Sequence, residues 1–227
     1  MKLPKLLLHL SLISLISLSA PIAEAKYRPK KVGSYKGPTI PTGTRGTCDD
    51  SKNPQRLTPI APLSHIGQTA TATPSVTWHV PKQKSYPMTI RLWKDTDILW
   101  ETTLQSQSGL MTQTLPKLNP NQIYRWQVVL ICNPKRPSIN QVIEAPITYL
   151  PVKLTTQIDQ LTEAELWYDA LTIAKTDRKQ YQTLLTDLIE TETLALPPEI
   201  GIGIATDTIP NRDLQQHLIN LKRLLSP

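Results

Sequence analysis

Short runs of alternating hydrophobic and polar residues occupy most of the chain between residues 57 and 151. They cover residues 76–80, 88–93, 98–104, 110–115, 123–132 and 142–150. A spacing of about 10–12 residues between such runs is typical of β-sandwiches and barrels. Prolines fall mostly at the boundaries of the runs, where a missing backbone N–H costs least: Pro74, Pro81, Pro87, Pro116, Pro120, Pro134 and Pro146. The pattern predicts a β-domain over residues 57–151.

The run 123–132 has the clearest strand pattern of the chain. Its alternation places Tyr124, Trp126 and Cys132 on one face and Arg125 on the other. Successive side chains of a strand point to opposite faces of the sheet, so the apolar set is expected to face the core. We therefore predict an inner strand that ends at Cys132 with its side chain on the core face.

The residues before this strand resemble the signature of the fibronectin type III fold. In that signature a leucine and a proline, here Leu118 and Pro120, precede a tyrosine, here Tyr124. The tyrosine hydroxyl bonds to upstream backbone and fixes the crossover between the two sheets. Gln122 departs from the signature, which usually has threonine at this position. The resemblance implies a fibronectin-III or immunoglobulin-like β-sandwich with Trp78 in its core.

Helical spacing replaces strand alternation in residues 152–227. Thr162 and Glu165 have the spacing of a capping box, and the helix expected after them buries Trp167. Asp177 is predicted to cap a second helix, which Pro197 and Pro198 would end. The fold class is therefore mainly β with an α extension, a sandwich followed by a small helical region.

A third helix is predicted over residues 211–225, after an apolar, turn-rich strand that begins at Gly201. Its leucines lie on one stripe, which we expect to pack against the other helices and the sandwich. Lys222 and Arg223 flank these leucines, so a protein partner or a membrane surface is the alternative for this helix.

The first 25 residues have the layout of a secretory signal peptide. Lys2 and Lys5 precede an apolar run, and the small-residue triplet Ala23-Glu24-Ala25 follows it. We expect cleavage after Ala25 and export to the periplasm or the outer cell envelope. Since no second long apolar run occurs, the mature chain is expected not to span a membrane.

Residues 26–56 form a basic arm rich in proline and glycine. The net charge of the chain is +7, and part of the excess lies in this arm, in Lys26, Arg28, Lys30, Lys31 and Lys36. We interpret the arm as a solvated, flexible extension, because charge runs are usually solvated. An anionic envelope polymer is the alternative partner. Nucleic acid is not expected, because an exported protein rarely meets it.

The chain has two cysteines, Cys48 in the arm and Cys132. An even cysteine count in an exported chain indicates a disulfide. The bond would tie the arm to the strand 123–132. Redox-active pairs normally have a close spacing such as C-x-x-C, which is absent here. We therefore predict a structural bond.

Residue patterns for catalysis are weak throughout the chain. The histidines His65, His79 and His217 have no partner at metal-ligand spacing, and His79 is expected to face solvent. Motifs for a serine nucleophile or a dinucleotide loop are absent. We therefore expect no catalytic, cofactor-binding or metal-binding residues, no cofactor, and structural roles for Trp78, Tyr124, Trp126 and Trp167.

Two alternatives to a binding protein stay open at this point. A hydrolase needs only two acids, which could come from anywhere in the chain; the candidates are Asp49, Asp50, Glu101, Glu144, Glu163, Glu165 and Asp169. Asp49 and Asp50 could also bind calcium, although two carboxylates fall short of a recognisable loop. A polymer-binding module could instead use the basic arm and exposed aromatic residues such as Trp93.

Six short stretches lie in order within residues 41–196: TRGTC from Thr44, LTP from Leu57, TWHVP from Thr77, LP from Leu115, YRW from Tyr124 through Cys132, and LWYDAL from Leu166. Taken together, they resemble a family of exported cyanobacterial proteins that carries domain of unknown function 928. The resemblance implies a cyanobacterial periplasm or outer envelope and brings no catalytic residues with it. Our functional expectation is a non-enzymatic binding or scaffold module that acts through contacts with an envelope protein. A carbohydrate-binding or carbohydrate-active protein is the alternative.

Overall fold

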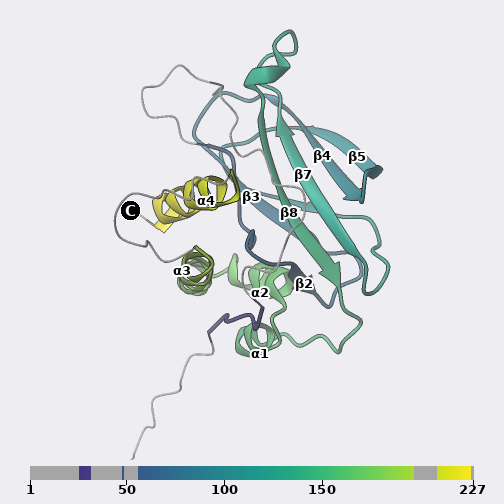
Figure 1. Cartoon of the computed structure of the whole chain (residues 1–227), viewed down its shortest axis with the longest axis vertical. Helices are drawn as coiled ribbons and strands as arrows, with labels where there is room; N and C mark the ends of the chain where they lie inside the picture. The colour runs from purple at the N-terminus through teal and green to yellow at the C-terminus, as the bar shows by residue number, and fades with distance from the viewer. Residues whose placement is uncertain (1–25, 32–47, 49–55, 197–208, 226–227) are drawn as a thin grey trace, which may run out of the picture.

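Eight strands form two sheets in the computed structural model, which describes residues 26–31, 48, 56–196 and 209–225 (Figure 1). The three-stranded sheet has the order β1-β3-β6, with β1 Thr58–Pro59, β3 Ser75–Val80 and β6 Gly109–Thr114. The five-stranded sheet has the order β2-β8-β7-β4-β5, with β2 Gly67–Thr69, β4 Pro87–Lys94, β5 Asp97–Gln105, β7 Ile123–Leu130 and β8 Gln141–Tyr149. All pairings are antiparallel except that of β2 with β8.

The six longer strands match the six predicted runs, and the mainly β class is confirmed. β1 and β2 were not predicted, because strands of two or three residues are too short to show alternation. The predicted end of the inner strand was wrong: β7 stops at Leu130, and Cys132 lies two residues beyond it. There the Cys132 backbone N–H donates to the Asn140 side chain at 3.1 Å instead of to a strand.

Pro146 lies inside β8, as it does inside the predicted run 142–150. The neighbouring strand β2 begins to pair with β8 only at Ile147. A proline in this position is tolerated because no strand there requires its missing N–H. The carbonyl of Pro146 still accepts a hydrogen bond, from the Tyr168 hydroxyl at 3.0 Å.

Tyr124 makes the contact expected of it at the crossover between the sheets. Its hydroxyl accepts a hydrogen bond from the Asn119 backbone N–H at 3.1 Å. Leu118, just upstream, is buried in the core with Trp78 and Trp126. The link therefore holds the segment before β7 against the strand that follows it.

The helical region contains α1 Ile158–Glu163, α2 Trp167–Ala174, α3 Arg178–Leu194 and α4 Ile209–Leu225. In Figure 1 the helices lie together on one side of the sheets. The cap of the second predicted helix is confirmed, because Asp177 Oδ1 accepts from the Gln180 N–H at 3.0 Å at the start of α3. No described helix is both long enough and apolar enough to cross a membrane.

The capping box predicted at residues 162–165 was wrong. Thr162 lies in the last turn of α1, and its hydroxyl donates to the Asp159 carbonyl at 2.8 Å. Glu165 has a φ of 61°, a left-handed conformation that interrupts the helical path before α2. The helix expected after these residues is present as α2 and buries Trp167 as predicted, whereas α1 before it was not predicted.

The third predicted helix begins two residues earlier than expected, at Ile209, and packs against α3. Its residues Leu218 and Leu221 are buried, as expected for a core-facing stripe. The predicted stop at Pro197 and Pro198 and the predicted strand at Gly201 lie outside the described residues.

Tyr168 of α2 joins the helical region to the five-stranded sheet. Its hydroxyl accepts from Trp126 Nε1 at 2.8 Å and donates to the Pro146 carbonyl. The ring lies so close to Gly67 that a Cβ there would come within 2.6 Å of it. A second hydrogen bond from α2 runs from Trp167 Nε1 to the carbonyl of Ile60, just after β1 of the other sheet, at 3.1 Å.

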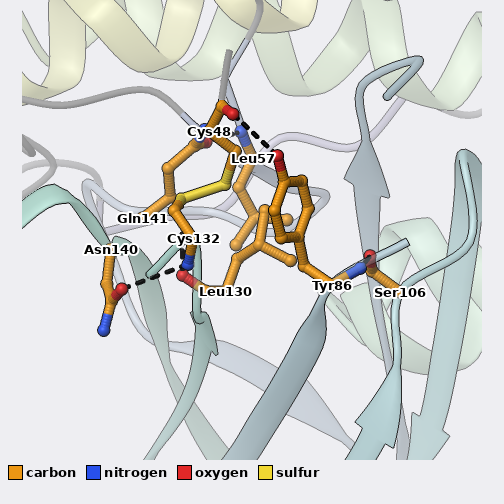
Figure 2. Close-up of a disulfide and its surroundings, with 8 residues drawn as sticks. All are labelled: Cys48, Leu57, Tyr86, Ser106, Leu130, Cys132, Asn140 and Gln141. Carbon is orange, nitrogen blue, oxygen red and sulfur yellow. Dashed lines mark hydrogen bonds between the residues drawn. A yellow bond between two sulfur atoms is a disulfide. The ribbon is translucent and has the colours of Figure 1, made fainter. Parts of the chain in front are cut away.

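The predicted disulfide between Cys48 and Cys132 is present (Figure 2). The Tyr86 hydroxyl, at the start of β4, donates to the Cys48 carbonyl at 2.7 Å. Nearby, the Leu57 N–H donates to the Gln141 side chain at 2.7 Å. The bond thus fixes Cys48 of the arm beside the connection between β7 and β8, which contains Cys132.

Replacing both Cys48 and Cys132 with serine should lower the free energy of unfolding by about 4–5 kcal/mol, the chain-entropy value for a loop of this size. The two residues are 84 positions apart, so the bond removes much freedom from the unfolded chain. Urea denaturation of the native and double-serine proteins measures the difference. Two free thiols in the denatured, unreduced native protein would contradict the bond.

Candidate functional site

Polar side chains cross the outward face of the five-stranded sheet in one row. Cross-strand neighbours bring together Glu101 of β5, Arg91 of β4, Gln127 of β7 and Glu144 of β8, with Arg125 of β7 beside Glu144. Their neighbours along each strand point the opposite way, into the core. We call these five residues the polar row.

Hydrogen bonds and ion pairs connect the whole polar row. Arg91 donates from Nε to Glu101 and from Nη1 to Gln127 Oε1 at 3.3 Å. Gln127 Nε2 donates to Glu144 Oε2 at 2.9 Å, and Arg125 Nε lies 3.3 Å from the same oxygen. Two cations thus match two carboxylates. Burial raises the pKa of Glu144, while Arg125 and the Gln127 hydrogen bond act in the opposite direction.

The polar row does not provide a pair of acids for hydrolysis. Glu101 and Glu144 are three strands apart, about 14 Å at a spacing of ~4.8 Å per strand. Glycosidase carboxyl groups lie roughly 5–9.5 Å apart. Trp93, the aromatic residue expected to be exposed, is half-buried, and the Arg125 guanidinium lies 5.4 Å from the centre of its ring. The ring is therefore no open platform for a sugar.

β5 forms an open edge of the five-stranded sheet, since it is the last strand in the described order. It is exposed at Asp97, Ile98, Leu99, Glu101, Thr103 and Gln105. Ile98 and Leu99 are large apolar side chains with exposed fractions of 47% and 53%. An edge strand presents unpaired backbone N–H and C=O groups, to which another strand can bind. We call this strand the β5 edge.

The β6 strand forms the corresponding edge of the three-stranded sheet. It follows β5 after residues 106–108, so the two edges meet at that turn. Leu110 of β6 is also exposed. One side of the β-region therefore carries two strand edges and exposed apolar side chains.

A second cluster of functional groups lies buried between the helices and the loop that precedes β2. The Glu192 carboxylate of α3 accepts from the Leu63 N–H at 3.2 Å, from the Ser64 N–H at 3.0 Å and from Ser64 Oγ at 2.8 Å. His65 Nδ1 lies 2.9 Å from Ser64 Oγ, and His65 Nε2 lies 2.7 Å from the Tyr27 hydroxyl. We call Tyr27, Ser64, His65 and Glu192 the buried cluster.

Serine, histidine and glutamate also occur together in hydrolases, but this geometry does not suit nucleophilic catalysis. All four side chains are buried, so no substrate reaches the serine. The Ser64 hydroxyl donates to Glu192, and the outer histidine nitrogen faces Tyr27. A serine nucleophile needs its hydroxyl on a histidine base and open to the reacting carbonyl. The buried cluster therefore has the contacts of a structural network.

Burial sets the protonation of this cluster. It raises the pKa of Glu192 to about 7, although hydrogen bonds from Ser64 and Leu63 oppose the shift. It lowers the pKa of His65 to about 4. Burial also raises the pKa of Tyr27 well above its usual value. Near neutral pH the histidine and the tyrosine are therefore uncharged.

The other predicted histidines lie apart from this cluster. His79 in β3 is half-buried, which corrects the expectation that it faces solvent, and burial lowers its pKa. His217 of α4 is buried and lines a small cavity with Gln141 and Asn220. Burial lowers the pKa of His217 to about 4, with the Ala61 backbone acting in the opposite direction.

The remaining candidate acids that the structure describes do not form a metal site. Asp169 is buried, where it accepts hydrogen bonds from the Thr69 and Thr71 hydroxyls and from the Ala70 N–H at 2.6 Å. Asp49 and Asp50 lie outside the described residues. Within the described part of the chain, no three His, Cys, Asp or Glu side chains are grouped closely enough to hold a metal ion.

The basic arm is not solvated at its start, contrary to the interpretation from charge. Tyr27 is only 1% exposed, and Lys26 forms an ion pair with Glu190 of α3. Arg28, Lys30 and Lys31 are exposed, and Lys36 lies outside the described residues. Sequence reasoning missed Tyr27 because a single aromatic residue among charged ones has no periodicity.

The chain belongs to the family described as Domain of Unknown Function (DUF928), which matches residues 40–194. The match includes the polar row, the β5 edge and three members of the buried cluster. It excludes residues 26–31 and α4. A comparison with curated proteins gives no match.

Replacing Glu192 with glutamine should remove a stabilising contribution that the native protein has in acid and loses near neutral pH. A carboxyl group whose pKa is raised by folding stabilises the fold fully below its ordinary pKa of 4.5, and this contribution is lost as the pH rises through about 7. The difference in free energy of unfolding between the native protein and Glu192→Gln should therefore be larger at pH 4.5 than at pH 7.5. Urea denaturation at both pH values measures it.

The variant His65→Gln provides the matched test with the opposite sign. His65 stabilises the fold above its ordinary pKa of 6.5 and loses this contribution as the pH falls through about 4. Its stability difference from the native protein should shrink from pH 7.5 to pH 4.5. Two differences that stay constant with pH would contradict the assigned protonation states.

Proposed function

We propose that this protein is an exported, non-enzymatic binding module of the periplasm or cell envelope, and that it contacts a protein partner through the β5 edge. The observation that carries the proposal is the exposure of this nine-residue strand, with Ile98 and Leu99 open to solvent at the side of a sheet. The partner would supply an extended segment that adds to the sheet.

The proposed architecture is a fibronectin-III or immunoglobulin-like β-sandwich. Its support is the division of the strands into β1-β3-β6 and β2-β8-β7-β4-β5, together with the hydrogen bond from Asn119 to the Tyr124 hydroxyl. Sandwiches of this kind occur in many cell-surface proteins, where edges and end loops make the contacts.

Two features support export. The first 25 residues have the pattern of a signal peptide. Both cysteines are joined in a disulfide, and such bonds persist in oxidising compartments. The compartment and the cyanobacterial setting are part of this proposal.

The β5 edge is better suited to a protein than to a polymer. Its exposed groups combine apolar side chains with backbone hydrogen-bonding groups, which a second strand complements. The polar row, by contrast, already satisfies its own charges, and Arg125 covers Trp93. In the arm, Lys26 is engaged with Glu190 rather than free for an anionic polymer. These contacts favour the protein partner over the carbohydrate alternative.

The double substitution of Ile98 and Leu99 with lysine should abolish partner capture in crosslinking and co-purification from the envelope fraction. Charge on an edge strand discourages pairing with another strand. Ile123→Lys on β7 is the matched control, because Ile123 is also about half exposed at 52% but lies on an inner strand of the sheet. We expect this control to retain the partner.

Hydrogen exchange on the recovered complex gives a second, direct readout. Strand addition should slow exchange of the β5 backbone amides relative to the free protein, because those amides gain hydrogen-bond partners. Recovery of the native protein alone, or equal capture by the double variant, would overturn the proposal.

A further inference from the structure

The segment 26–31 packs its first two residues against α3, α2 and the loop before β2, and we call the surface that they contact the groove. In Figure 1 the segment is the short purple stretch near α1 and α2. Tyr27 packs its ring against Trp167 of α2, with the ring centres 4.9 Å apart. Its side chain is buried as completely as the tryptophans of the core. Tyr27 is therefore part of the packed interior and does not lie on the surface.

The backbone of Tyr27 and the side chain of Lys26 all contact residues of α3. The Tyr27 N–H donates to Asp187 Oδ2 at 3.0 Å, and its carbonyl accepts from Thr191 Oγ1 at 3.3 Å. The Lys26 ammonium pairs with Glu190. One face of α3 thus contacts the backbone of Tyr27 on both sides and the charge of the preceding residue.

The hydroxyl of Tyr27 makes the groove selective for tyrosine over phenylalanine. It lies 2.7 Å from His65 Nε2, whose other nitrogen already faces Ser64. Without the hydroxyl, the buried Nε2 would lose its partner, and a buried polar group without a partner is unfavourable. Sites built to bond a hydroxyl reject ligands that lack it. Ser64 and Glu192 hold the histidine ring in place behind it.

The segment differs from the groove in its exposure and in its relation to the family. Arg28, Lys30 and Lys31, which follow Tyr27, are exposed. The groove itself lies within the stretch that matches the family, at residues 63–65, 167 and 187–192, whereas the segment that fills it lies outside that stretch. The groove therefore lies in the part of the chain that matches the family, and the residues that fill it lie before that part.

We propose that this groove is a peptide-binding site specific for a lysyl-tyrosyl sequence, filled here by the protein's own residues 26–31, and that it binds the same sequence supplied by a second copy of the chain when its own is removed. Covalent linkage gives the internal segment a high effective concentration, so the intact chain outcompetes free peptide. This site is separate from the β5 edge and does not depend on the function proposed for it.

The test uses full-length Tyr27→Ala, which vacates the groove, and the fluorescent peptide Lys-Tyr-Arg-Pro-Lys-Lys, measured by anisotropy. We expect Tyr27→Ala to bind the peptide and the native chain to bind none. The same peptide with phenylalanine in place of tyrosine should bind at least about tenfold more weakly, because it leaves His65 unpaired. Adding His65→Ala to Tyr27→Ala should abolish the preference for tyrosine.

Near-ultraviolet circular dichroism establishes whether Tyr27→Ala is folded. If it is not, recovery of the native spectrum on addition of the peptide supports the site. Absence of both binding and spectral recovery up to millimolar peptide would overturn the proposal. Equal binding of the tyrosine and phenylalanine peptides would overturn it as well.

Discussion

The junction at Tyr168 is the contact on which the arrangement of the two regions depends. One hydroxyl bonds the indole of Trp126 and the carbonyl of Pro146, so a single side chain joins α2 to two neighbouring strands. Both partners are buried, where losing one hydrogen bond leaves a polar group without water. Gly67 makes the junction possible, because any larger residue would meet the tyrosine ring. These contacts therefore fix the position of α2 against the five-stranded sheet.

The arm is fastened to both regions at its described points. Tyr27 anchors its start in the helical region, and the disulfide anchors Cys48 beside the end of β7. The two anchors differ in their chemistry. The disulfide is covalent and independent of pH in the folded state, whereas the Tyr27 groove contains groups whose protonation changes between mild acid and neutral pH. A change of pH would therefore affect the contacts of Tyr27 and leave the disulfide unchanged.

The two clusters of polar residues illustrate how burial decides what a group can do. The buried cluster contains the residue types of a hydrolase, but its serine hydroxyl donates to Glu192, its histidine faces a tyrosine, and all of these side chains are buried. The polar row is more accessible, yet its charges neutralise one another across four strands. Among the described strands, β5 lies at the edge of its sheet, where the backbone itself offers hydrogen bonds. This edge is the basis of the proposed contact with a protein partner.

Local patterns in the sequence determined the elements with strong periodicity. Alternation located the six longer strands, and Asp177 marked the start of α3, because these signals depend on neighbouring residues only. The cysteine count determined the disulfide, since a chain with two cysteines allows a single internal pairing.

The tertiary structure alone decided the contacts between residues far apart in the chain. It put Tyr27 against His65 and Asp187, brought Glu101 and Glu144 into one row, and left β5 at an edge. It also overruled the capping box at Thr162, where a left-handed Glu165 breaks the helix. Each of these outcomes depends on which distant surfaces pack together, and neither periodicity nor composition encodes that packing in a form that can be read locally.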